Sequence, residues 1–171
     1  MERAAHTQTL FERLSSSSDE DVGDALSELS RQDASQPTSK LVSKLVQLTE
    51  HANPAIREGA VFNLGVRWSL PEGYLPILRM LTGGEDSEDV LSAAILSASA
   101  LLGNGVGESS VVCQCLANIA TSNSLGMEVR KRAYTVLLLL QKHVSKPEFA
   151  RLSADPHLVS IDQQWLKRFR H

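Results

Sequence analysis

The stretch NPAIREGAVFNLG, residues 53–65, carries the strongest fold signal in the chain. Asn53 is a favoured helix N-cap and Pro54 suits the first helical position, so a helix is expected to begin here. A spacing of four then places three apolar residues on one face of that helix, where they can be buried: Ile56, Ala60 and Leu64. The helix is expected to extend to about residue 68, with a kink at Gly65.

The rest of the chain has the same helical pattern. Apolar residues recur at spacings of three and four, and alternating β-branched runs are absent, so an all-α fold is expected. Expected N-caps are Ser18 (with Asp21 in capping-box spacing), Ser87 and Ser124. The expected helices cover about residues 7–14, 19–30, 37–50, 54–68, 71–82, 88–103, 108–121 and 125–144, a short segment from 147, and 156–169.

The buried positions of the longest helices recur with a period of about 34–40 residues. One series is Val22, Ile56, Val90 and Val129, at separations of 34, 34 and 39 residues. Four residues later come Leu26, Ala60, Ala94 and Ala133, and eight residues later come Ser30, Leu64, Ala98 and Leu137. Helix pairs that repeat at this period are typical of α-solenoids. Ordinary amphipathic periodicity in an irregular helical bundle is the alternative.

Residues 53–65 resemble the first helix of a HEAT repeat, with its Pro, Ile-Arg, small residue and Leu-Gly. MEVRKRAYTVLLLL (127–140) resembles the same motif, SEDVLSAAILSASALLG (87–103) does so with Leu91 in place of Arg, and DVGDALSELS (21–30) is a degenerate copy. The resemblance covers about residues 19–145 and implies a short right-handed α-α superhelix of about four HEAT-like helix pairs. It also implies that Arg57 and Arg130 contact acidic side chains of neighbouring repeats. Residues 1–18 are then an N-terminal cap and residues 146–171 C-terminal capping helices of a single domain.

The chain is expected to be a soluble, cytoplasmic protein. It has 171 residues, 42% of them apolar, and a formal net charge of -3. Residues 1–124 hold 8 Lys+Arg and 16 Asp+Glu, whereas residues 125–171 hold 9 and 4, so the charge changes from -8 to +5 along the chain. Neither an apolar signal-peptide segment nor a run of about 20 apolar residues is present, so no membrane association is expected.

No residue pattern points to catalysis, a metal or a cofactor. Cys113 and Cys115 lie two residues apart, which on a helix disfavours a mutual disulfide, and no second cysteine pair completes a zinc site. The five histidines are scattered. The glycines of GNGVG (103–107) follow a helix rather than a strand, which favours a turn over a phosphate-binding loop. A non-enzymatic protein is therefore expected.

The second helix of each pair is expected to line the concave face and bind a protein partner. Its polar stripes are Lys40, Lys44 and Gln47, then Glu72, Tyr74 and Arg79, then Ser110, Gln114 and Asn118. An ordinary solvated helix face is the alternative for each of these residues. An adaptor or an inhibitor is expected, and the acidic N-terminal part would suit an immunity protein that neutralises a basic toxin.

Nucleic-acid binding is a second hypothesis, because basic residues gather towards the C-terminus. They are Arg130, Lys131, Arg132, Lys167 and Arg168. Consecutive residues spread around a helix, so a solvated, salt-bridged face is the alternative, with Trp165, Leu166 and Phe169 as an apolar cap. A third hypothesis, suggested by the chromophore-lyase members of the HEAT-like family, is an accessory subunit of a larger assembly.

Overall fold

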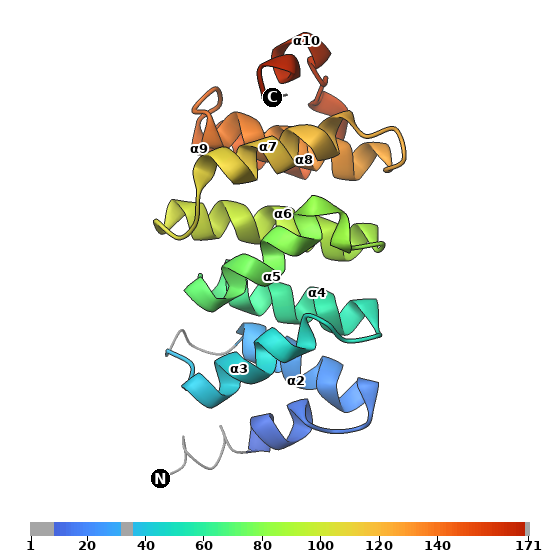
Figure 1. Cartoon of the computed structure of the whole chain (residues 1–171), viewed down its shortest axis with the longest axis vertical. Helices are drawn as coiled ribbons and strands as arrows, with labels where there is room; N and C mark the ends of the chain where they lie inside the picture. The colour runs from blue at the N-terminus through green and yellow to red at the C-terminus, as the bar shows by residue number, and fades with distance from the viewer. Residues whose placement is uncertain (1–8, 32–35, 170–171) are drawn as a thin grey trace.

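The computed structural model describes residues 9–31 and 36–169. All regular structure within these residues is helical, as the sequence predicts, and no strand occurs in them (Figure 1). None of the helices in these ranges combines the length and apolarity that a bilayer crossing requires. The expected helix over residues 7–14 lies partly outside the described residues, and its described part, residues 9–14, is helical.

The following helices are α2 (Asp19–Arg31), α3 (Ser39–Leu48), α4 (Pro54–Phe62), α5 (Tyr74–Arg79), α6 (Glu88–Gly103), α7 (Ser109–Thr121), α8 (Met127–Leu140), α9 (Lys146–Ala154) and α10 (Gln163–Leu166). Two π-helical turns, η1 (Asn63–Arg67) and η3 (Met80–Gly84), extend α4 and α5. Short 3-10 turns cover η2 (Pro71–Gly73), η4 (Pro156–Leu158) and η5 (Lys167–Phe169).

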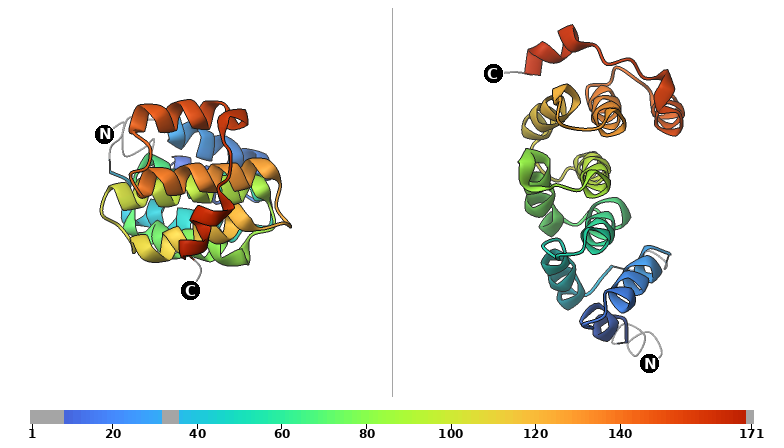
Figure 2. Two further views of the ribbon diagram at one scale, coloured as in Figure 1. Left: turned by 90° about the horizontal axis from the view of Figure 1, so that it is seen from above. Right: turned by 90° about the vertical axis from the view of Figure 1, so that its right-hand side faces the viewer.

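The helices stack along the long axis of the molecule, with the N- and C-terminal parts at opposite ends (Figure 1). Helices α2, α4, α6 and α8 form one column, in which each helix contacts the next, and we call it the even column. Helices α3, α5 and α7 form the odd column beside it. The stack is bowed, and the odd column lies on the outer side of the bow (Figure 2, right).

The even column is held together by the apolar residues that recur in the sequence. Val22, Ile56, Val90 and Val129 are all buried, and so are Leu26, Ala60, Ala94 and Ala133. In the third series Leu64, Ala98 and Leu137 are buried and Ser30 is half-buried. The alanines let the helix backbones come close together, so a larger side chain at these positions would overpack the contacts.

Polar contacts join the same turns of neighbouring helices. The Asn53 amide donates to the Asp19 carboxylate at 2.7 Å, and the buried Asn63 amide donates to the Leu26 carbonyl at 3.1 Å. The Ser97 hydroxyl donates to the Val61 carbonyl at 3.1 Å. These bonds join residues 34, 37 and 36 positions apart, which falls within the 34 to 39 residues that separate members of the buried series.

The predicted N-caps are confirmed for three helices. The side-chain oxygen of Asn53 accepts from the Ala55 N–H at 2.9 Å, that of Ser18 from Asp21 at 3.4 Å, and that of Ser87 from Val90 at 3.5 Å. The prediction for Ser124 is wrong. Helix α8 begins at Met127 after Gly126, whose N–H donates to the Glu88 carboxylate at 2.6 Å, and the Ser124 hydroxyl bonds to that of Ser122.

Gly65 marks a close helix contact within a π-turn instead of a simple kink. A Cβ atom on Gly65 would lie 2.1 Å from the Cβ of Ser97 and 2.7 Å from its Cα. Because the Cα belongs to the backbone of α6, a side-chain rotation cannot relieve this overlap. Glycine therefore allows α6 to approach the end of α4.

Both C-terminal helix predictions need correction. Helix α8 ends at Leu140 rather than near residue 144, and Lys142 just after it has a φ of 57°, which a right-handed α-helix does not accommodate. The single helix expected over 156–169 is divided into η4, α10 and η5. Asp155 and Asp162 each cap a separate turn, and the buried Val159 lies in the extended segment between them.

Candidate functional site

The most enclosed charged cluster surrounds Arg57 on α4. Its guanidinium binds both carboxylate oxygens of Glu85, through Nε at 2.8 Å and Nη2 at 2.6 Å, and its Nη1 donates to the carbonyls of His51 and Ala52 at 2.9 Å each. The Arg57 side chain is 14% exposed and that of Glu85 only 2%. This arginine therefore ties the turn before its own helix to the loop before α6.

The pKa values show which effect dominates at this pair. Burial would raise the pKa of Glu85, but hydrogen bonds from Arg57 and from the Ser87 N–H outweigh it and lower the pKa. The hydrogen bond to Glu85 is the largest cause of the raised pKa of Arg57. Both groups are charged at neutral pH, which fits a structural ion pair better than a catalytic acid or base.

Arg130, the corresponding residue of α8, has a different role. Its Nε donates to the carbonyl of Ala120, at the end of α7, at 3.3 Å. The acidic contact expected for both arginines is therefore present at Arg57, whereas Arg130 satisfies a helix-end carbonyl instead.

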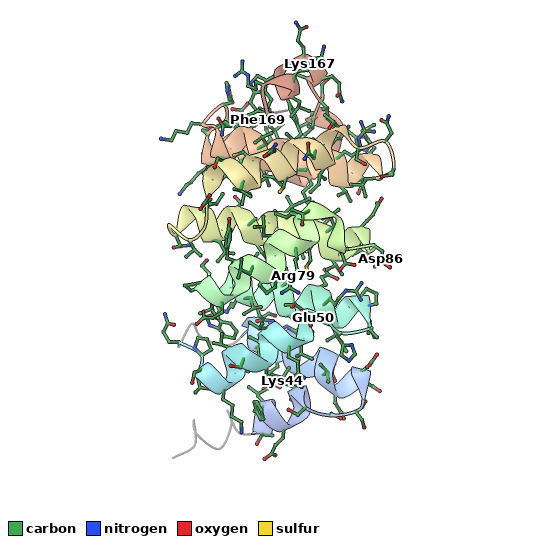
Figure 3. All side chains as sticks on the ribbon, viewed as in Figure 1. Lys44, Glu50, Arg79, Asp86, Lys167 and Phe169 are labelled. Carbon is green, nitrogen blue, oxygen red and sulfur yellow. The ribbon has the colours of Figure 1, made fainter. Side chains whose placement is uncertain are left out.

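A wide hollow of about 690 Å³ lies beside the Arg57 cluster, between the α3–α4 turn and the α5–α6 loop. Arg79 and Glu50 form an exposed ion pair at 2.7 Å across it near the middle of the view in Figure 3, and Asp86, at the right-hand side of that view, also lines the hollow. Both side chains of the Arg79–Glu50 pair are 66% exposed. Because the hollow is wide open and the charges of Arg79 and Glu50 are already paired, it does not point to a particular ligand or reaction.

The predicted protein-binding residues lie along the odd column, and several of them already have partners within the chain. The Lys40 ammonium lies 3.9 Å from the ring centre of Phe11, and the Lys44 ammonium donates to the Gln47 side chain at 3.1 Å. The Tyr74 hydroxyl accepts from the Glu108 N–H at 3.1 Å.

On η2 and α7, Glu72, Ser110, Gln114 and Asn118 are exposed. The sequence placed all of these residues on the concave face, whereas the odd column that carries them lies on the outer side of the bow (Figure 2, right). Their binding role stays a prediction.

The basic residues of the nucleic-acid hypothesis differ in their surroundings, and their binding role stays a prediction. Lys131 donates to the carbonyl of Pro156 at 2.8 Å, while Arg132 is exposed on α8. Lys167 and Arg168 are exposed on η5, and the Arg168 guanidinium lies 5.5 Å from the ring centre of Trp165. Trp165 also makes edge-to-face contacts with Tyr134, His143 and Phe169, and Leu166 is fully buried, which gives the predicted apolar cap.

The cysteines are both free and buried in α7. Burial raises the pKa of the Cys115 thiol, which disfavours the reactive thiolate. Within residues 9–31 and 36–169, no group of three or more His, Cys, Asp or Glu side chains is placed to hold a metal ion.

The sequence prediction missed a groove on the even column. We call it the α4–α6–α8 groove, and its defining residues are Glu58, Phe62, Asp89, Leu96, Glu128 and Arg132. It encloses about 310 Å³ and crosses three successive helices. One signal was available in the sequence: Phe62 and Leu96 follow the buried Ile56 and Val90 by six residues each, so both lie on one outward row.

Comparisons of the chain with protein-family models, with curated proteins and with solved structures give no match.

Proposed function

We propose that the chain is a HEAT-like α-solenoid that binds another protein and catalyses no reaction itself. The observation that carries this proposal is the recurrence of equivalent contacts at one spacing. The buried series recurs at separations of 34 to 39 residues, and the Asn53–Asp19, Asn63–Leu26 and Ser97–Val61 hydrogen bonds join residues 34, 37 and 36 positions apart. Helix pairs that contact mainly their neighbours build extended surfaces, and such surfaces are used for binding.

Two surfaces are available for this function. The odd-column residues Lys44 and Gln114 represent the surface expected from the sequence, and the α4–α6–α8 groove represents the one found in the structure. A stable protein interface needs about 800 Å² on each partner, so a chain of this size accommodates one such interface on either face. An adaptor and an inhibitor of immunity type are both compatible with this proposal.

Affinity capture from the lysate of the source organism, with mass spectrometry, tests the function. The bait proteins are the wild type, the odd-column variant Lys44→Glu/Gln114→Lys, the groove variant Glu58→Lys/Asp89→Lys, and a control, Glu20→Lys/Asp24→Lys on α2. We expect one protein to be retained by the wild type and the control and lost with one of the two surface variants. Retention of no protein at physiological salt would contradict the proposed function.

Nucleic-acid binding stays the alternative prediction, and no contact among residues 9–31 and 36–169 specifically favours it. Arg132, Lys167 and Arg168 are the exposed residues among its candidates. Capture of nucleic acid that falls steeply with salt and is lost in Arg132→Glu/Lys167→Glu/Arg168→Glu would replace the protein-binding proposal.

A further inference from the structure

The α4–α6–α8 groove has an acidic row along one side. Asp89 and Glu128 each directly precede a buried valine, Val90 and Val129, so they occupy equivalent places near the starts of α6 and α8. Glu58 on α4 continues the row. In the part of the chain that the structure describes, no hydrogen bond or ion pair engages the carboxylates of these three acidic residues. Their charge is therefore available to an incoming partner.

The other side of the groove is an apolar row. Leu96 lies seven residues after Asp89, and Phe62 occupies the equivalent place on α4. The Phe62 side chain is 37% exposed, so its ring is accessible from the groove. Beyond Glu88 and Asp89 in its first turn, helix α6 adds no charge to this surface, because no charged residue occurs from Val90 to Gly107. Interfaces are depleted of charge at the centre and polar at the rim, and the groove follows this arrangement.

The groove has dimensions that suit a helix. On α6, seven residues at 1.5 Å per residue separate Asp89 from Leu96 by about 10 Å, which is close to the diameter of one α-helix with its side chains, and on α4 the four residues from Glu58 to Phe62 give about 6 Å. Helices pack about 8–10 Å apart, so crossing from α4 to α8 covers about 20 Å, or about 14 residues of a docked helix.

The groove also continues beyond α8. A smaller hollow of about 120 Å³ shares Leu96, Glu128 and Arg132 with it and extends to Leu152 and Val159 under α9 and η4. This extension gives an apolar side chain of a partner a place at the C-terminal end of the groove.

We propose that the α4–α6–α8 groove binds a cationic amphipathic helix of the partner protein. This inference rests on the proposed protein-binding function and specifies the chemistry of the partner. Lysine or arginine side chains on one side of that helix face Glu58, Asp89 and Glu128, and its apolar side packs on Phe62 and Leu96. The charge of the rim selects the partner, because Glu58, Glu88, Asp89 and Glu128 outnumber Arg132 among the lining residues.

The test uses three synthetic peptides of about 14 residues, the length set by the helix rise. The first carries leucine and lysine at helical spacing, the second has the same composition in an order without an apolar face, and the third has glutamate in place of lysine. Fluorescence anisotropy measures the affinity of each at physiological ionic strength. Backbone amide NMR of the full chain maps where the first peptide binds.

The variants separate local contact from net charge. Glu58→Lys/Asp89→Lys changes the groove, and Glu20→Lys/Asp24→Lys changes exposed acidic residues of α2. Each pair raises the formal net charge by four, from -3 to +1. Each pair also replaces one acidic residue in the first turn of a helix, Asp89 in α6 and Glu20 in α2. The loss of stability expected from placing a positive charge at a helix N-terminus is therefore similar in the two variants.

We expect the first peptide to bind at least about tenfold more tightly than the other two. Only the first peptide offers both positive charges for the acidic row and an apolar face for Phe62 and Leu96. Relative to the wild-type protein, the groove variant should bind the first peptide about tenfold more weakly, and the α2 variant should bind it less than about twofold more weakly. NMR shifts of the wild-type protein should fall on α4, α6 and α8. Equal weakening by both variants, or shifts on the odd column, would overturn the proposal.

The capture experiment keeps this proposal distinct from the proposed function. If capture retains a protein that is lost with Lys44→Glu/Gln114→Lys but not with the groove variant, protein binding holds and the groove proposal is overturned. If capture retains no protein at all, the proposed function itself is contradicted, whatever the peptides do.

Discussion

Removal of the Arg57 guanidinium is expected to destabilise the fold far more than removal of the nearby Arg79 guanidinium. Both arginines pair with a glutamate 28 or 29 residues away, and both pairs connect the α3–α4 region with the α5–α6 region. The pairs differ in burial, since Glu85 is 2% exposed and Glu50 is 66% exposed. Arg57→Met and Arg79→Met therefore form a matched comparison of a buried and an exposed ion pair.

The size of the effect follows from the groups left behind. Loss of one partner from a buried ion pair costs about 3–5 kcal/mol, because the remaining charge is buried without compensation. Glu85 would keep the N–H groups of Asp86 and Ser87, so we expect about 3 kcal/mol, near the lower end of that range. An exposed pair such as Arg79–Glu50 contributes about 0–1 kcal/mol. For a chain of this size, 3 kcal/mol corresponds to a fall in Tm of about 6–12 °C.

Urea unfolding followed by circular dichroism measures these differences. A double-mutant cycle with Arg57→Met and Glu85→Gln should give a coupling energy of about 1–3 kcal/mol, while the cycle for Arg79 and Glu50 should give less than about 1 kcal/mol. Equal losses for the two arginine variants would refute the conclusion that burial makes the Arg57–Glu85 pair structural.

Three further results are expected. Gly65→Ala should destabilise the protein by about 1–3 kcal/mol, because the added Cβ overlaps α6. Gly23→Ala should stabilise it by up to about 1 kcal/mol, because nothing lies within 4 Å of the added Cβ and alanine favours a helix. Thermal melting of the two variants compares these effects. Because folding lowers the pKa of Glu85 from its ordinary value of 4.5, its contribution to stability is complete at neutral pH and is lost as pH falls from 4.5 through the lower pKa of the folded state. Urea unfolding at a series of pH values should therefore show a weaker acid dependence in Glu85→Gln. Trp165→Ala should remove the aromatic contacts of the C-terminal segment, cost about 2–3 kcal/mol, and raise hydrogen exchange in α10; unchanged exchange would argue against its role as a cap.

Local signals in the sequence predicted most of the helices correctly. Asn53-Pro54, Ser87 and Ser18 begin helices through contacts within a few residues, and the spacing of Ile56 and Ala60 defines a buried face without information from the rest of the chain. The prediction failed where local signals competed. Ser124 resembles an N-cap, but the nearby Gly126 binds Glu88 of another helix, and α8 begins after that contact.

The sequence by itself determined the all-helical class, most helix starts and the spacing of the buried residues, because these depend on contacts between residues one to four positions apart. Only the tertiary structure decided that Gly65 lies against Ser97, that Arg57 pairs with Glu85, and that acidic and apolar rows from three helices form one groove. From one helix to the next in the column, those features join residues about 28 to 39 positions apart. Their geometry depends on how closely the helices approach, and side-chain volume at the contacts sets that distance.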